Sequence, residues 1–469
     1  MYKTFTEIKA ALEKGRTVQE ILQKYLESIK ERDGLNAFLE VFEESAKKKA
    51  LEVDEKIKNG NAGRLAGMVI GIKDNICYKG HKVSAASKIL EGFESIYSAT
   101  VVERLLAEDA VIIGRLNCDE FAMGGSNENS AYGTVKNALN EDYVPGGSSG
   151  GSATAVSAGL CTVALGSDTG GSIRQPASFT GTIGFKPTYG RVSRYGLIAY
   201  ASSFDQIGPI ANDIADIALV TEIIAGKDDY DGTASSQDVP SLALSPLKNK
   251  LKIAYIKETL DTEGVDPEVK SRIEQLVNSL RADGHELIPV SFSYIEQMVP
   301  TYYVLTTAEA SSNLSRFDGV HFGYRSTEAV GVEETYVKSR TEGFGAEVKR
   351  RIMAGTFVLS QGYYDAYYTK AQKVRRLIQD RTNEILQQSD FILLPTTPST
   401  AFELNQVKDP IKMYLQDIYT VQANLSGNPA ISLPLGKHSN GMPFGLQLIG
   451  KHFGEKELLD TSAYLMDFC

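Results

Sequence analysis

The chain has 469 residues, of which 42% are hydrophobic and 23% charged, so it can form one large domain or two to three smaller ones. Its formal net charge of −10 argues against a chain that holds nucleic acid by itself, because phosphate binding needs clustered Lys and Arg. The longest basic run, Lys47-Lys48-Lys49, lies in a helical pattern and indicates a solvated helix face.

The spacing of the cysteines and the length of the apolar segments indicate in which cellular compartment the chain works. Cys77, Cys118, Cys161 and Cys469 are widely spaced and form no CxxC pair. This spacing favours neither a disulfide framework nor a zinc site, so we predict no metal and a reduced, cytoplasmic compartment. We expect neither a membrane span nor a signal peptide, because no apolar run is long enough for the first and the N-terminus lacks the apolar core of the second.

The first 60 residues have a helical pattern. Thr17 and Glu20 form a capping box, and an apolar face follows at helical spacing. We therefore expect residues 1–60 to form a helical region packed on the core of the molecule. The predicted apolar face consists of Val18, Ile21, Leu22, Tyr25, Leu26 and Ile29.

From residue 65 onward, short apolar segments that suit buried strands appear. Residues 65–76 indicate a strand that delivers Lys73 at its end, and residues 109–121 indicate another. Because apolar strands occur from end to end of the chain, we favour one large α/β domain over separate modules.

The second half of the chain predicts a strand–helix–strand pattern. Strands at 250–256 and 285–292 flank a helix at 266–284, which has Asp266 as its N-cap and Gly284 just past its end. We expect this pattern to recur near the C-terminus, with buried strands at 390–398, 428–436 and 444–450.

Residues 144–176 are the most informative stretch. Two Gly/Ser clusters, GGSSGGS at 146–152 and TGGSIR at 169–174, flank an Ala-rich segment that predicts a packed helix leading into a short strand. This apolar segment argues against a flexible linker. Because glycine allows tight turns, the stretch can hold a nucleophile beside converging backbone N–H groups.

Two other interpretations of the first cluster are disfavoured. Residues 146–150 match the G-x-S-x-G elbow of α/β-hydrolases, but that elbow follows a strand directly, and residues 136–145 have the composition of a loop. A phosphate-binding loop of the GxxxxGK[ST] type needs a lysine that the cluster lacks. The clusters therefore indicate acyl-transfer chemistry.

An acyl-transfer site needs a nucleophile and a base, and in this sequence candidate bases are scarcer than candidate serine nucleophiles. None of the five histidines has a recognisable catalytic context. A lysine can take a proton only when it is neutral, and burial lowers its pKa. Lys73 follows the apolar run MVIGI and is the lysine best suited to enter a core. The alternative is a strand-end lysine that reaches solvent or pairs with Asp74.

Lys73, GGSSGGS and GGSIR, in this order, closely resemble the motifs of the amidase signature family. The spacing agrees, with 75 residues from Lys73 to Ser148 and 24 from Ser148 to Ser172. The resemblance implies that Ser172 is the nucleophile, Ser148 a bridging serine after a cis peptide bond, and Lys73 the base. The implied oxyanion hole consists of the backbone N–H groups of Thr169, Gly170, Gly171 and Ser172.

The same resemblance implies a fold. We expect an α/β architecture with a large, mostly mixed β-sheet core and helices on both faces. Residues 61–469 would form one compact domain, with the signature stretch at about 62–210. Asp168 and Arg174 are expected to brace the site, and Ser149 to hold the loop by hydrogen bonds.

Segments outside the triad make the resemblance strongest with one branch of the family, the glutaminase subunits of tRNA-dependent amidotransferases. This implies that the chain hydrolyses glutamine and supplies ammonia for converting Glu-tRNA(Gln) to Gln-tRNA(Gln), Asp-tRNA(Asn) to Asn-tRNA(Asn), or both. The alternative is a stand-alone amidase of small or aryl amides. The segments that carry this resemblance are 123–137, 202–211, 309–325 and 347–376.

A glutamine pocket needs a guanidinium for the α-carboxylate and a carboxylate for the α-ammonium group. Arg350 or Arg351 fits the first, and the family position favours Arg350; the alternative for either is a solvated helix face. Asp417 matches the family's carboxylate, with a helix-surface carboxylate as the alternative. The choice between Tyr302 and Tyr303 as a pocket residue stays open.

The resemblance also implies partners. We expect a heterotrimer with a tRNA-binding subunit that is both kinase and transamidase, and with a small helical subunit. The acidic balance agrees with tRNA being contacted mainly through the partner. We expect no cofactor on this chain, because ATP and Mg²⁺ would belong to the partner.

Overall fold

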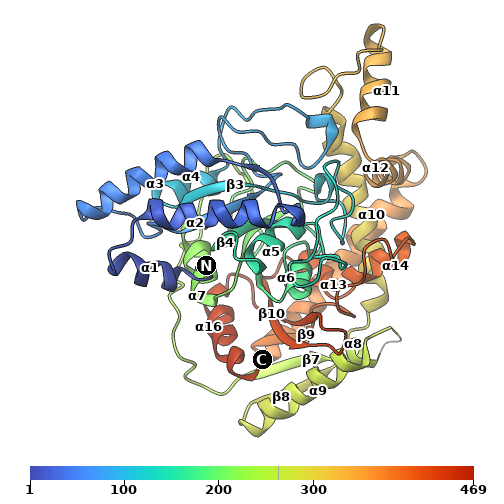
Figure 1. Cartoon of the computed structure of the whole chain (residues 1–469). Helices are drawn as coiled ribbons and strands as arrows, with labels where there is room; N and C mark the ends of the chain where they lie inside the picture. The colour runs from blue at the N-terminus through green and yellow to red at the C-terminus, as the bar shows by residue number, and fades with distance from the viewer. Residues whose placement is uncertain (262–263) are drawn as a thin grey trace.

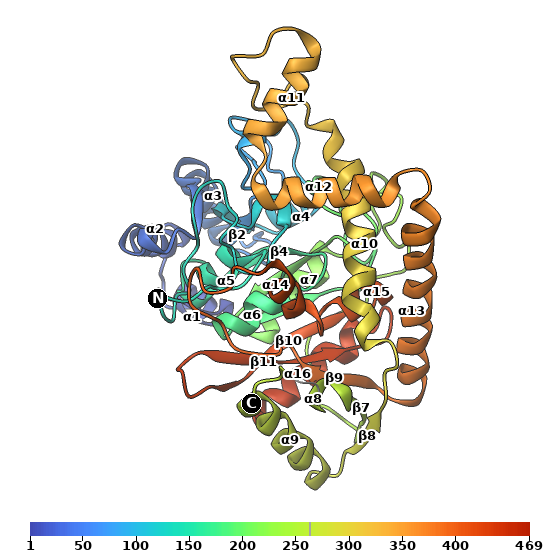
Figure 2. The same cartoon turned by 90° about the vertical axis from the view of Figure 1, so that its right-hand side faces the viewer.

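Figures 1 and 2 show the computed structural model, which describes residues 1–261 and 264–469. Its centre is one mixed sheet in the order β1-β3-β2-β4-β6-β5-β10-β11-β9-β7-β8, with helices on both sides. The predicted large mixed sheet covered by helices is confirmed. None of the helices in the described ranges is both long and apolar enough to span a membrane.

The elements of the described chain have the following bounds. The strands are β1 Phe38–Val41, β2 Val69–Lys73, β3 Val111–Leu116, β4 Val163–Asp168, β5 Ile183–Lys186, β6 Gln206–Ala211, β7 Lys252–Ile256, β8 Glu286–Val290, β9 Phe391–Pro395, β10 Ala430–Lys437 and β11 Pro443–Ile449. The helices are α1 Phe5–Glu13, α2 Val18–Glu31, α3 Glu43–Lys58, α4 Thr100–Ala107, α5 Gly150–Ser157, α6 Arg174–Thr180, α7 Ile214–Ile224, α8 Glu258–Asp261, α9 Pro267–Ala282, α10 Ile295–Asn313, α11 Gly331–Gly343, α12 Ala346–Leu359, α13 Lys370–Gln388, α14 Pro410–Tyr414, α15 Val421–Ser426 and α16 Glu455–Leu465.

The strands β2, β3 and β4 carry the signature stretch to one edge of the sheet. β2 pairs in parallel with both β3 and β4. Because parallel strands end at the same edge, Lys73 at the end of β2 and Asp168 at the end of β4 reach the same side. The predicted helix and strand between the Gly/Ser clusters are present as α5 and β4.

The N-terminal region contains a strand that we did not predict. The capping box of Thr17 and Glu20 is present, and the predicted apolar face of α2 is buried. Residues 38–41, however, form β1, which pairs antiparallel with β3 at the edge of the sheet. Four half-buried residues are too few to show a two-residue alternation in the sequence, so the helical interpretation of this segment is wrong.

The C-terminal strands are connected differently from the prediction. β7, α9 and β8 form the expected strand–helix–strand unit, with parallel strands. β10 and β11, in contrast, form an antiparallel hairpin, and β11 pairs antiparallel with β9. Only residues 438–442 join β10 to β11, whereas a crossover to a parallel strand needs about a dozen. Asn440-Gly441, a strong hairpin signal, stands in that loop.

Candidate active site

Lys73 is fully buried at the end of β2. Asp74 does not pair with it, because Arg115 Nη1 donates to Asp74 Oδ1 at 2.8 Å and the Ser84 hydroxyl also donates to this carboxylate. The alternatives of a solvent-exposed lysine and of a Lys73–Asp74 pair are therefore excluded.

Three hydroxyl groups surround the amine of Lys73. Its Nζ lies 2.7 Å from Ser148 Oγ, 3.0 Å from Ser149 Oγ and 2.9 Å from Ser167 Oγ. Burial lowers the pKa of Lys73 to about 8, which brings the neutral amine within reach at ordinary pH. A neutral amine has two N–H donors and one lone pair. When Ser149 and Ser167 accept the N–H bonds, the lone pair faces Ser148, the nearest of the three.

The peptide bond between Gly147 and Ser148 is cis, as the resemblance implied. The Gly147 N–H donates to Gln175 Oε1 at 2.8 Å, and the Asp119 N–H donates to the Ser148 carbonyl at 3.1 Å. A Cβ atom at position 147 would overlap the Asp119 carboxylate, so only glycine fits there. Bonds on both sides of this peptide thus fix Ser148 beside Lys73.

Ser172 lies in the turn that leads into α6 and is 8% exposed, whereas Ser148 and Lys73 are fully buried. The Ser149 N–H donates to the Ser172 carbonyl at 3.1 Å, which joins the two Gly/Ser clusters. Within the described ranges, no hydrogen bond links the hydroxyls of Ser148 and Ser172. The structure therefore shows a direct contact between Lys73 and Ser148 and places the backbone of Ser172 beside that of Ser149.

The loop before Ser172 approaches two neighbouring segments closely. A Cβ atom on Gly170 would lie 2.5 Å from the Tyr302 hydroxyl, and one on Gly171 would overlap the Thr420 side chain. Gly171 also has φ +130°, which side chains other than glycine rarely adopt. Two glycines are therefore required at these positions by space and by backbone conformation.

Asp168, at the end of β4, holds this loop through ionic and hydrogen bonds. Arg174 donates to both of its oxygens, from Nε at 3.0 Å and from Nη2 at 2.9 Å. Burial alone would raise the pKa of Asp168, but Arg174 outweighs it and the pKa falls to about 2. The Gly171 N–H also donates to Asp168, at 2.8 Å. The expectation that the Gly171 N–H belongs to the oxyanion hole is therefore corrected, because this N–H is used within the loop. Thr169 and Gly170 remain as the predicted donors that precede Ser172.

The two arginines of α12 point in different directions. Arg350 has a side chain that is 52% exposed and pairs with Glu347, whereas Arg351 is 5% exposed. Arg351 Nη1 donates to the Tyr200 hydroxyl at 2.9 Å, and its guanidinium lies 5.2 Å from the ring centre of Tyr303. Successive helical residues point about 100° apart, so only one of the pair can face the interior. The preference for Arg350 is corrected to Arg351.

Asp417 lies in the same cluster as Arg351. The Tyr303 hydroxyl donates to Asp417 Oδ2 at 2.8 Å, so Tyr303 bridges the guanidinium and the carboxylate. Burial raises the pKa of Asp417 to about 7, because the Tyr303 hydroxyl and the Arg351 charge offset the loss of hydration only in part. Asp417 is half-buried and its carboxylate accepts the Tyr303 hydroxyl, which argues against a freely solvated helix-surface carboxylate.

Both candidate tyrosines contribute to this region, in different ways. Tyr302 packs against Gly170 of the loop before the nucleophile, and Tyr303 contacts Asp417. Thr420 makes a second connection, because its hydroxyl donates to the Gly170 carbonyl at 2.6 Å and its N–H donates to the Asp417 carbonyl at 3.0 Å. The charged cluster thus adjoins the catalytic loop.

Three residues around the site were missed at the level of sequence. Ser167 contacts Lys73, and Asn75 Nδ2 donates to Ser167 Oγ at 2.9 Å. Asp119 lies against Gly147. Ser167 meets Lys73 because β2 and β4 are neighbours in the sheet, and that pairing is not visible in the spacing of the motifs.

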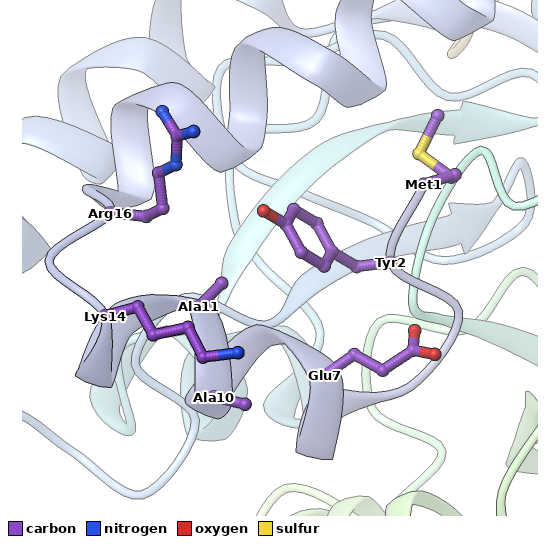
Figure 3. A pocket seen from close by; sticks show the side chains of 7 residues that line it. All are labelled: Met1, Tyr2, Glu7, Ala10, Ala11, Lys14 and Arg16. Atoms are coloured by element: carbon purple, nitrogen blue, oxygen red, sulfur yellow. The ribbon is translucent and has the colours of Figure 1, made fainter.

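The hollow in Figure 3 belongs to another part of the molecule. It is lined by residues between Met1 and Arg16 at the N-terminal helix α1 and includes the charged side chains of Glu7 and Lys14. None of the serines or carboxylates described above borders it. The candidate site is therefore defined by contacts at the ends of β2 and β4 and not by this hollow.

Comparison with known proteins agrees with this geometry. The model of the family described as Amidase matches residues 20–459. The chain belongs to the amidase family. Lys73, Ser148, Ser172, Arg351 and Asp417 all lie within the part that the amidase model matches.

Relatives of this amidase-family chain cover nearly its whole length. The A subunit of the Glutamyl-tRNA(Gln) amidotransferase of Chlorobium luteolum is 51% identical over 453 residues, covering 96% of this chain and 93% of its own. The protein of the same name from Fusobacterium nucleatum is also 51% identical, with 94% and 91% covered. The crystal structure of the corresponding Thermotoga maritima protein, which bears the same name, has 41% identity and a TM-score of 0.77, covering 96% and 94%. The resemblance to the amidase family is confirmed.

Proposed function

We propose that this chain hydrolyses glutamine and supplies the ammonia for a tRNA-dependent amidotransferase. The observation that carries the proposal is the cluster of buried Arg351 with half-buried Tyr303 and Asp417 beside the loop that leads to Ser172. A free amino acid carries a carboxylate and an ammonium group on one carbon, and this cluster offers one partner for each. Relatives that are about 50% identical over nearly the full chain are named as the A subunit of Glutamyl-tRNA(Gln) amidotransferase.

The chemistry begins at Lys73. The neutral amine takes the hydroxyl proton of Ser148, which lies 2.7 Å away, while Ser148 takes the proton of Ser172. The Ser172 oxygen then forms a bond to the amide carbon of glutamine, and the developing oxyanion is held by the N–H groups of Thr169, Gly170 and Ser172. The relay returns a proton to the departing nitrogen, the C–N bond breaks, and ammonia leaves. Water hydrolyses the acyl-enzyme to glutamate by the same relay.

The pocket orients the substrate. Arg351 would bind the α-carboxylate and Asp417 the α-ammonium group, with the amide reaching toward Ser172. A neutral aryl amide offers no opposite charge to either side chain, so Arg351 and Asp417 would keep only their partners within the protein, Glu347 and Tyr303. This favours glutamine over the alternative substrates, small and aryl amides.

Partners complete the proposed reaction. Ammonia would pass to a tRNA-binding subunit that is both kinase and transamidase and uses ATP and Mg²⁺, with a small helical subunit completing a heterotrimer in the cytoplasm. The product is Gln-tRNA(Gln), Asn-tRNA(Asn) or both. The name of the relatives, in which this chain type is one subunit of an amidotransferase, supports such an assembly.

The test is to express the chain with and without the two candidate partner subunits and to measure glutamine hydrolysis. We expect co-purification and a glutaminase that the partners stimulate strongly. High activity of the isolated chain on apolar aryl amides, with no response to partners and none to glutamine, would show that it is a stand-alone amidase.

A further inference from the structure

Glu120 is a buried carboxylate that the proposed chemistry does not use. It is 2% exposed and lies in the short turn Glu120–Ala122 that follows Asp119. Both of its oxygens accept the backbone N–H of Gly345, at 3.1 and 2.9 Å, and the Ser87 hydroxyl donates to it as well. Glu120 thus joins two segments that are more than two hundred residues apart in the chain.

The bonded N–H belongs to the start of α12. Gly345 is the N-cap residue of this helix and, having no side chain, cannot cap the helix itself. A Cβ atom at position 345 would overlap the Glu120 carboxylate, so glycine allows the close approach. A carboxylate at a helix N-terminus also interacts favourably with the exposed N–H groups and the helix dipole. Glu120 therefore serves as the cap of α12.

The first turn of α12 determines where Arg351 lies. Glu347, two residues after the cap, accepts the Nε–H of Arg351 at 2.8 Å and the Tyr414 hydroxyl at 2.8 Å. A shift of this turn would carry Glu347 with it and change the direction of the guanidinium. In Figure 2, α12 crosses the body of the molecule and α11 projects beyond it, so this end of α12 is also where the projecting segment joins the body.

The residue before Glu120 contacts the catalytic side. The Asp119 N–H donates to the Ser148 carbonyl at 3.1 Å, and the Asp119 carboxylate accepts the Asn127 N–H at 3.0 Å. Phe121, on the other side of Glu120, has φ +49°, a conformation that is uncommon for a bulky residue. Two adjacent residues thus touch the peptide of the bridging serine and the helix that carries Arg351.

We propose that Glu120 is a positioning residue that holds the first turn of α12, and with it Arg351, in a fixed relation to the Ser148 loop. It touches no substrate and acts through Glu347 and Arg351. This inference rests on the proposed glutaminase function, in which Arg351 binds the α-carboxylate. Loss of the Glu120 charge should therefore weaken glutamine binding and leave the chemical step intact.

The test compares Glu120→Gln with the control Glu128→Gln in the assembled complex. Glu128 lines a surface pocket together with Glu120 and Gly345, but its carboxylate accepts the N–H of Asn405 and, within the described residues, makes no hydrogen bond to α12. For Glu120→Gln we expect the KM for glutamine to rise roughly tenfold at unchanged kcat, because a charge-assisted bond becomes a neutral one. In an Arg351→Lys background the rise should be much smaller. Glu128→Gln should leave KM within about twofold.

Hydrogen exchange provides a readout that does not depend on activity. Backbone amides of residues 345–349 should exchange faster in Glu120→Gln than in the wild type and Glu128→Gln. An unchanged KM together with unchanged exchange would overturn the proposed role of Glu120, and so would an equal fall in kcat and kcat/KM. If the wild-type complex hydrolyses no glutamine, the proposed function fails, and the exchange rates still decide whether Glu120 holds the first turn of α12.

Discussion

The proposed catalytic centre and the proposed substrate pocket adjoin each other but hold their charges by different means. In the catalytic centre, hydroxyl groups surround the single amine of Lys73, and burial lowers its pKa to about 8. In the pocket, the charges of Arg351 and Asp417 lie on either side of Tyr303. The contrast shows what each region must do: a base works only when its amine can be neutral, whereas a pocket for an amino acid needs charges of both signs.

The first way to test the comparison is to remove the nucleophile. Ser172→Ala should lower glutamine hydrolysis by about 10⁴-fold or more, because the covalent step is lost. Transfer of free ammonia to the tRNA should continue, since the partner needs no nucleophile from this chain. The control is Ser157→Ala, whose hydroxyl bonds to the Thr180 carbonyl. Loss of the ammonia-dependent reaction in Ser172→Ala would contradict the division of labour.

Removing the base should have an effect nearly as large. Lys73→Met should lower kcat/KM by about 10³-fold or more. In the wild type, the pKa of about 8 predicts that kcat/KM rises with pH up to that value, because Lys73 acts only after it loses its proton. The measurement is the pH profile of glutamine hydrolysis at constant ionic strength. A profile without a group near 8, together with an active Lys73→Met enzyme, would remove lysine from the relay.

The pocket side of the comparison can be tested with a matched pair on one helix. Arg351→Met should raise the KM for glutamine by about 100-fold, because a buried charge-assisted bond is lost. Arg350→Met, one residue earlier, should change KM by less than about threefold, since Arg350 pairs at the surface. Steady-state kinetics on both variants decides the matter. A larger effect at Arg350 would make that residue the carboxylate ligand instead.

The sequence predicts more of the proposed catalytic centre than of the proposed substrate pocket. The proposed catalytic groups stand at strand ends and in glycine turns, which are local patterns, so the sequence predicts the buried strand that ends at Lys73 and the helix and strand that follow the first cluster. The pocket is built from segments far apart in the chain. A local signal existed even so, because Val348, Arg351, Gly355 and Val358 repeat at helical spacing and are all buried.

Other features needed the partner segments themselves. The contact of Ser167 with Lys73 depends on the pairing of β2 with β4, and the short strand β1 depends on β3. The hairpin of β10 and β11 could have been predicted from the sequence alone, because Asn440-Gly441 is a strong local signal for a tight turn. Sequence patterns therefore predict elements and their ends, while sheet order and side-chain direction come from packing over long separations.

A smaller effect is expected when the pocket carboxylate loses its charge. Asp417→Asn should raise the KM for glutamine by about tenfold, since the α-ammonium group loses an ionic partner. Burial raises the pKa of Asp417 to about 7, so the wild-type KM should fall as the pH rises through 7 and Asp417 ionises. In Asp417→Asn this dependence should flatten. Measuring KM between pH 6 and about 8.5 at saturating partner concentrations checks both statements; an unchanged slope in the variant would assign the ionisation to another group.

The smallest expected effect separates the two neighbouring tyrosines. Tyr303→Phe removes one hydrogen bond to Asp417 and keeps the ring beside Arg351, so the KM for glutamine should rise by about threefold to tenfold. Its kcat should stay within about twofold, because the catalytic loop is untouched. Tyr302 packs on Gly170 instead, so Tyr302→Ala should lower kcat more than it raises KM. The contrary outcome is that both variants change KM and kcat in the same proportion. The pocket and the loop before Ser172 would then act as one unit, and the two regions could not be distinguished where they meet.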